Sequence, residues 1–92
     1  MDMRLGRKKG IKKMLTNEQI VELERQFNDY SLNRMLNEKI GYYEDSFIFC
    51  GKMGALRIAL NTLGYIVNVE KIDEKYGVKY KYYKLAEKEK EE

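Results

Sequence analysis

The stretch from residue 47 to residue 64 constrains this chain most, because its centre is apolar in almost every direction of a helix. Within residues 52–63 the apolar side chains cover nearly every direction except one narrow strip, occupied by Gly54, Arg57 and Asn61. A helix on the surface of a globular protein needs an apolar stripe only about 100° wide. The sequence therefore predicts a buried central helix against which the other elements pack.

Two features of this central helix matter for packing. Leu56 and Leu60 lie one turn apart on its apolar side, and we expect both to be among the most buried side chains. Gly51, Ala55 and Ala59 form a ridge of small residues with a spacing of four, so they lie above one another and let another backbone approach closely. The ridge either packs on a preceding helix of the same chain or forms the seam of a homodimer.

The composition predicts one globular domain in a reducing compartment. The 92 residues are 43% hydrophobic and 36% charged, a balance typical of a folded domain. Cys50 is the only cysteine, so no disulfide can form within the chain, and we expect it to be a small core residue. No apolar run reaches the length of a membrane span, and the basic start is not followed by the apolar segment of a signal peptide. We therefore expect a cytoplasmic protein.

Codon usage gives a hint of origin. Residues with AT-rich codons (Phe, Tyr, Met, Ile, Asn and Lys) far outnumber Gly, Ala, Arg and Pro. This composition suggests a low-GC bacterium, or one of its phages or plasmids.

Residues 1–14 are expected to form a flexible basic arm in front of a single domain that covers residues 15–86, with a charged tail at 87–92. The arm carries one acid, Asp2, against Arg4, Arg7, Lys8, Lys9, Lys12 and Lys13, for a local charge of +5 in a chain with a net charge of +3. Such an arm can contact the phosphates of a nucleic acid. It can equally be a solvated tail, or a leader upstream of a natural start at Met14.

The domain should open with a helix over residues 16–30. Thr16 and Gln19 have the spacing of a capping box, and Leu15 and Ile20 that of a hydrophobic staple. The apolar stripe that follows is Ile20, Leu23, Phe27 and Tyr30. The opposite face is acidic and carries Glu18, Glu22, Glu24 and Asp29 against Arg25.

The next segments leave alternatives open. Residues 28–31 have turn chemistry, which predicts a second helix over 32–40 that ends at Gly41; a single bent helix is the alternative. Residues 47–50 fit either an early start of the central helix or a short strand. We favour the early start, with Asp45 or Ser46 as its cap.

The chain should close with a β-hairpin. Apolar and polar residues alternate over 65–70 and again over 78–83, and Gly77 can adopt the positive φ that a turn between them requires. The inward face is predicted to hold Tyr65, Val67, Val69, Val78, Tyr80 and Tyr82, and the outward face Asn68, Glu70, Lys79 and Lys81. From Ala86 onward we expect a frayed helix or disorder.

These elements define an α+β domain, with two or three N-terminal helices around a buried central helix, followed by a C-terminal β-hairpin. Their order is similar to that of a winged helix, in which a helix-turn-helix precedes a β-wing. The resemblance implies that the central helix reads DNA. Here its polar face reduces to Arg57, Asn61 and Lys52, of which Arg can read guanine and Asn adenine.

Nothing in the sequence points to catalysis. The chain has no histidine and one cysteine, so acid–base chemistry would fall to other groups. Glu44 and Asp45 are adjacent, and neighbours on a helix do not face each other. Residues 51–54 lack the glycine and the Ser or Thr of a phosphate-binding loop. We therefore expect a non-enzymatic domain with no catalytic residue, metal site or cofactor.

Two binding functions remain. The first is a regulatory domain that binds nucleic acid through the arm, helped by Arg57, Lys79, Lys81 and Lys84, because lysines interleaved with tyrosines can contact phosphates and stack on bases. The alternative is a phage- or plasmid-type module that docks on a host protein, such as a defence nuclease, and inhibits or redirects it. Its interface anchors would be Tyr42, Tyr43 and Tyr83.

Overall fold

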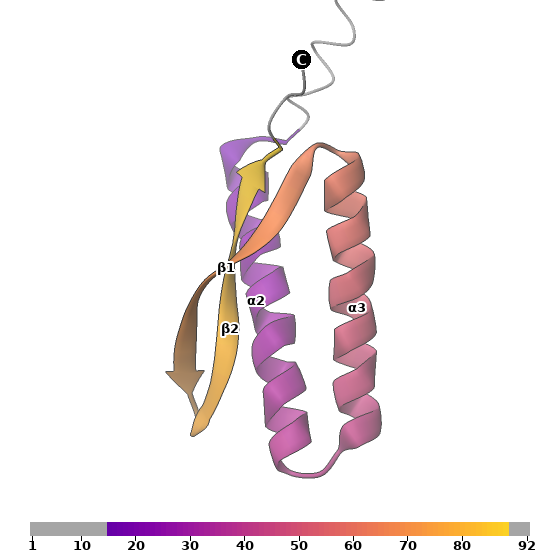
Figure 1. Cartoon of the computed structure of the whole chain (residues 1–92), viewed down its shortest axis with the longest axis vertical. Helices are drawn as coiled ribbons and strands as arrows, with labels where there is room; N and C mark the ends of the chain where they lie inside the picture. The colour runs from indigo at the N-terminus through magenta and orange to yellow at the C-terminus, as the bar shows by residue number, and fades with distance from the viewer. Residues whose placement is uncertain (1–14, 89–92) are drawn as a thin grey trace, which may run out of the picture.

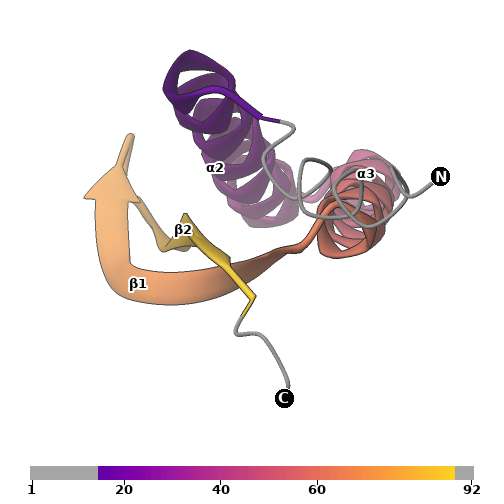
Figure 2. The same cartoon turned by 90° about the horizontal axis from the view of Figure 1, so that it is seen from above.

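Two antiparallel helices and a β-hairpin make up residues 15–88, the part of the chain that this computed structural model describes. The elements are α2 (Asn17–Lys39), α3 (Tyr43–Thr62), β1 (Tyr65–Lys75) and β2 (Val78–Glu87). The hairpin crosses one face of α2, while α3 lies along another (Figure 1). Seen from above, α2, α3 and the hairpin occupy three corners around a common centre (Figure 2). The predicted α+β order with a C-terminal hairpin is therefore confirmed.

Both ends of α2 follow the local sequence signals. Thr16 Oγ1 accepts a hydrogen bond from Gln19 N at 3.1 Å, and Thr16 N donates to Gln19 Oε1 at 2.9 Å, which completes the predicted capping box. At the other end Gly41 has a φ of +88°, and Tyr42 N donates to Asn37 O at 2.8 Å. This is the Schellman arrangement, in which a left-handed glycine stops the helix and satisfies its last carbonyls.

The predicted turn at residues 28–31 does not exist. α2 is a single helix of 23 residues, so the prediction of a separate helix over 32–40 is wrong and the single-helix alternative is right. Asn28 and Ser31, the residues that suggested a turn, are both buried. Their side chains bond to the backbone of β2 rather than to their own backbone, so they do not compete with the helix.

Polar side chains of α2 form hydrogen bonds with backbone groups along β2, at one edge of the hairpin. Asn28 Nδ2 donates to Tyr83 O at 3.1 Å, and Asn28 Oδ1 accepts from Tyr83 N at 2.7 Å. Two further bonds join Ser31 Oγ to Lys81 O (2.7 Å) and Leu85 N to Glu24 Oε2 (2.9 Å). Residues 24, 28 and 31 share one face of a helix, so α2 presents them in a row to the backbone groups of β2 that β1 leaves unpaired.

A two-residue turn joins the strands, and both of its residues have positive φ. The values are 52° at Tyr76 and 78° at Gly77, the combination required by the tight turn that matches the twist of a hairpin. The predicted role of Gly77 is thus confirmed.

The inward face of the hairpin is only partly as predicted. Tyr65, Val67, Val78 and Tyr80 are buried, whereas Val69 is exposed. A bulge between Val69 and Lys71 shifts the register, so the inward positions change along the hairpin. In β2 the buried residues are 78, 80 and 83, so the alternation is interrupted after Tyr80. Tyr83 therefore takes the place in the core that was predicted for Tyr82.

The main core lies where α2, α3 and the hairpin meet. Phe27 and Leu60 are its largest fully buried side chains, and the Phe27 ring meets the Tyr83 ring edge to face, with 4.8 Å between centroids. The prediction for Leu60 is confirmed. Leu56 is only partly buried against this cluster, so it is not among the most buried side chains.

The beginning of α3 is confirmed as an early helical start, because the helix runs from Tyr43 and residues 47–50 form no strand. Its predicted caps are wrong. Tyr42 is the capping residue and makes no side-chain capping bond, and Asp45 and Ser46 lie inside the helix.

The prediction of burial on all sides of α3 is also wrong. Phe47, Ile48 and Ile58 are 73%, 54% and 69% exposed, and Cys50 is exposed as well. The small-residue ridge of Gly51, Ala55 and Ala59 is exposed and does not pack on α2. The physical reason is that α2 and the hairpin touch only one side of α3, and residues 15–88 contain no further element to cover the other.

Two other predictions change. The winged-helix likeness is limited to element order, since the exposed face of α3 is apolar and unsuited to read a DNA groove. β2 runs to Glu87, and Lys88 N donates to Gly64 O at 2.8 Å, so residues 86–88 are not a frayed tail. The arm at 1–14 and residues 89–92 lie outside the described part of the chain.

Candidate nucleic-acid interface

A pocket of about 340 Å³ between α2 and β2 is lined by three basic residues. Its charged lining residues are Arg34, Lys79, Lys81 and one acid, Glu38. The rest of the lining consists of Ser31, Met35, Ile72, Tyr80 and Tyr83. We call this pocket the basic groove.

The contacts between α2 and β2 fix the positions of these cations. Ser31 is held by its bond to Lys81 O, and Arg34 follows it by three residues, so it emerges from α2 beside β2. Tyr80 is buried against α2, which leaves Lys79 and Lys81 exposed with a spacing of two, on one side of the strand. Basic residues more than forty positions apart in sequence thus line one pocket.

Arg57 of α3 does not line the groove but contacts Tyr83, which does. Its guanidinium carbon lies 5.8 Å from the Tyr83 ring centroid and 5.6 Å from that of Phe27. A long hydrogen bond of 3.5 Å joins its Nη1 to Val67 O. Aromatic faces attract a cation without cancelling its charge, so this arginine is held in position and remains available to an anion.

Arg57 and the three cations of the groove are not neutralised by direct pairing. Among residues 15–88, no carboxylate oxygen lies within 4.0 Å of their nitrogen atoms. Glu38 lines the groove, and the strand register sets Glu74 opposite Lys79, so two acids lower the local charge without removing the positive excess.

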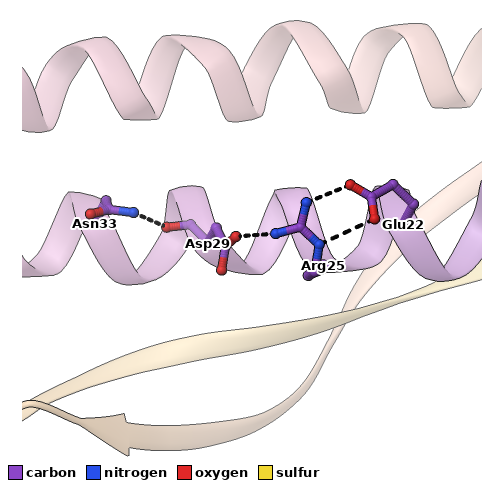
Figure 3. Close-up of polar contacts among 4 residues, drawn as sticks. All are labelled: Glu22, Arg25, Asp29 and Asn33. Atoms are coloured by element: carbon purple, nitrogen blue, oxygen red, sulfur yellow. Dashed lines mark hydrogen bonds and ion pairs between the residues drawn. The ribbon is translucent and has the colours of Figure 1, made fainter.

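The acidic face of α2 lies elsewhere. Arg25 sits between Glu22 and Asp29 on that face (Figure 3), bonded to both carboxylates, with its Nη1 2.6 Å from Asp29 Oδ2. The hydrogen bond from Arg25 lowers the pKa of Glu22 below its ordinary value. Arg25 and Asp29 border a second pocket that shares Tyr80 with the basic groove but none of its cations. The arginine of this face is therefore engaged, and the face remains acidic.

The other predicted site residues are scattered. Lys84 lies 3.9 Å from Glu24 Oε1 and is not part of the groove. Tyr42 and Tyr43 are exposed, as an interface requires, but Tyr83 is only 7% exposed, so its prediction as an interface anchor is wrong. The six cations of the arm, Arg4, Arg7, Lys8, Lys9, Lys12 and Lys13, lie outside the described residues.

Sequence reasoning missed Arg34. The sequence predicted a turn at residues 28–31 and a separate helix over 32–40, and Arg34 was not among the predicted site residues. A continuous helix places it one turn beyond Ser31, on the side that faces β2, so the missing information was the continuity of α2.

Other site chemistry is not found in the described residues. Within 15–88 no three histidine, cysteine, aspartate or glutamate side chains come together in a way that could hold a metal ion. Neither α2 nor α3 is long and apolar enough to cross a membrane. In comparisons, the chain matches no model of a known protein family, no curated protein and no solved structure.

Proposed function

We propose that this chain is a small non-enzymatic domain that binds nucleic acid through its phosphate backbone, using the basic groove together with the basic arm. The observation that supports it is the convergence of Arg34, Lys79 and Lys81 on one pocket, without an acid paired to any of them among residues 15–88. Unpaired like charges brought together lower the stability of a fold, so a bound anion would offset a repulsion that the free protein carries.

The recognition would be electrostatic rather than sequence-specific. Lysine and arginine contacts to phosphates position a protein on a nucleic acid but carry no sequence information. Tyr80 and Tyr83 are both buried, so stacking of bases on these tyrosines is not part of the proposal.

Fluorescence anisotropy with labelled single-stranded and double-stranded oligonucleotides tests this function. Each neutralised phosphate contributes about 0.7–0.9 to the slope of log affinity against log salt. The Arg34→Gln/Lys81→Gln variant should therefore bind more weakly and lose about 1.4–1.8 from that slope. Deletion of residues 1–13 should weaken the affinity further and make its dependence on salt less steep.

A matched control removes the same number of charges from the other side of the hairpin. Lys71 lies over the Tyr82 ring and Lys75 lines the second pocket, so neither belongs to the groove. The Lys71→Gln/Lys75→Gln variant should leave the salt slope of the groove contacts unchanged. Equal losses in the two double variants, or binding that ignores salt, would reject the groove as the site.

A second candidate function is a phage- or plasmid-type module that binds a host protein. It is favoured by Ile40, Tyr42 and Tyr43, large side chains exposed together at the connection between α2 and α3. A pull-down from a low-GC bacterial lysate after nuclease treatment separates the two functions. A protein retained by the wild type but lost with the Tyr42→Ala/Tyr43→Ala variant would support this candidate, and loss of every partner after nuclease would remove it.

A further inference from the structure

The outer face of α3 is a large apolar surface on which no residue of 15–88 packs. Phe47, Ile48 and Ile58 lie there more than half exposed, with Tyr43 58% exposed at its border. Scattered exposed apolar residues are common on proteins, but a contiguous patch on one helix marks an interaction surface. We propose that a second copy of this chain covers the face, so that the protein is a homodimer held by antiparallel packing of α3 on α3.

The spacing of the face is self-complementary. Its central stripe reads Tyr43, Phe47, Gly51, Gly54, Ile58 and Thr62, with intervals of four, four, three, four and four. The intervals are palindromic about a point between the two glycines. A two-fold axis at that point, perpendicular to the helices, sets Gly51 at the height of Gly54 of the second copy and Phe47 at the height of its Ile58. Phe47 of each copy then meets Ile58 of the other, and Tyr43 meets Thr62, as an isologous interface requires.

The two glycines have no explanation within one copy. A methyl group added at Gly51 or Gly54 would meet no atom within 4 Å, so the fold leaves room for alanine at both positions. Glycine inside a helix is less favourable than alanine. Close approach of a second helix at the centre of the stripe accounts for both glycines, because the separation of packed helices depends on the side chains at their contact.

The four large side chains of the face supply most of the area that a small dimer interface needs. From their exposed fractions, Tyr43, Phe47, Ile48 and Ile58 offer roughly 300–450 Å² on each copy. A stable interface buries about 1,000 Å² or more in total, which is about 500 Å² from each partner. The small residues and the helix backbone between the large side chains supply the remainder.

The charges at the ends of the helix favour the antiparallel arrangement. The first turn of α3 is acidic, with Glu44 and Asp45, and at the other end of the helix Lys88 Nζ donates to Asn61 Oδ1 at 3.0 Å. Antiparallel packing brings the acidic turn of one copy to the same end of the interface as Lys88 of the other. Parallel packing would place the two acidic turns together. The inference is independent of nucleic-acid binding.

Analytical ultracentrifugation and light scattering of the full chain over a range of concentrations test the dimer. We expect the measured mass to rise to twice that of the chain. Ile58→Ser should raise the dissociation constant about tenfold or more, since each dimer loses two isoleucines. Ile72→Ser is the matched control, because this isoleucine is exposed to a similar extent, 59% against 69%, but lies on the hairpin. It should leave the dissociation constant unchanged.

A second variant separates the interface from the fold. Gly51→Ala/Gly54→Ala should maintain or raise the thermal stability of the monomer, because alanine favours the helix and has room there. It should nevertheless weaken the dimer. A wild-type chain that remains a monomer at about 100 µM, or a dimer that both the glycine variant and Ile58→Ser leave intact, overturns the inference. In the first case something other than a second copy covers α3, such as residues 1–14 or a different protein.

Discussion

Asn28 should contribute more to stability than any other polar side chain of α2. It is the only one that both donates to and accepts from the backbone of β2 among the described residues, through Tyr83 O at 3.1 Å and Tyr83 N at 2.7 Å. Both Asn28 and Tyr83 are buried, so water has little access to the backbone groups that a truncation would leave unpaired.

The magnitude follows from those two groups. A buried donor or acceptor without a partner costs about 1–3 kcal/mol, so Asn28→Ala should lose roughly 2–6 kcal/mol from two of them. Alanine is the better helix former and returns up to about 0.7 kcal/mol. The net loss should be about 1–5 kcal/mol from a total of about 5–15 kcal/mol. The melting temperature should fall by about 5–40 °C.

Thermal and urea denaturation measure this loss, with Asn33→Ala as the control. Asn33 is on the same helix, and its Nδ2 donates only to Asp29 O, a carbonyl of the preceding turn. Its truncation should change the free energy of unfolding by no more than about 0.5 kcal/mol. If Asn28→Ala and Asn33→Ala have the same melting temperature, the bonds from Asn28 to the backbone of β2 add nothing to stability and the prediction is wrong.

A second substitution at the same position tests the direction of the bonds. Asn28→Asp keeps an acceptor for Tyr83 N but turns a negative oxygen toward Tyr83 O. The folded state then favours the protonated carboxyl, which can donate to that carbonyl, so the pKa at this position is raised on folding. Stability should therefore be higher below the ordinary carboxyl pKa and fall as the pH rises through the raised value. A variant whose stability shows no such rise in acid would contradict the assigned bond directions.

Three further predictions concern the core and the hairpin. Leu60→Ala should lose about 3–5 kcal/mol in thermal melts and the partly buried Leu56→Ala about 1–2 kcal/mol, because the loss scales with the cavity that is left; equal losses would contradict this ranking. Tyr76→Asn should gain about 0.5–1 kcal/mol in urea unfolding, since the exposed Tyr76 has a φ of 52° that asparagine tolerates better. Burial, followed by the nearby Asp73, raises the pKa of Tyr80 above 10.0, so the stability that it contributes is present below pH 10 and is lost as the pH rises through the raised value. Tyr80→Phe should therefore lose less stability than the wild type as the pH rises above 10, and a parallel decline of both would contradict the shift.

Signals carried by a few neighbouring residues predicted the local structure well. Thr16 and Gln19 define the start of α2, Gly41 its end, and Gly77 the turn of the hairpin. In each case the residues satisfy their own backbone, so no distant part of the chain can change the outcome. The order of elements, and with it the α+β class, follows from these boundaries.

Features that depend on distant partners could not be predicted. Asn28 and Ser31 have the same chemistry in a turn as at the edge of a strand, and only the docking of β2 distinguishes the two. The bulge near Val69 cannot be recognised from the alternation of apolar residues. For this reason the sequence predicted Tyr82 in the core, where the structure has Tyr83.

The outer face of α3 shows a different limit. An apolar surface in a sequence indicates that something covers it, but not whether the cover belongs to the same chain. Phe47 and Ile58 were assigned to an internal core, and the described residues leave them open. For the basic groove, Lys79 and Lys81 were recognisable from the strand pattern, whereas Arg34 depended on the course of α2.

The side-chain bonds from α2 to β2 also determine how fast individual backbone protons are replaced by deuterium. The amide protons of Tyr83 and Leu85 are donated to Asn28 and Glu24, so the pairing of the two strands does not protect them. A hairpin detached from α2 would expose both to solvent while its ladder persisted. The exchange rates of these two amides therefore measure the free energy of separating α2 from β2. The remaining ladder amides report the opening of the hairpin itself, so one deuterium-exchange experiment resolves two steps of unfolding that a thermal melt merges.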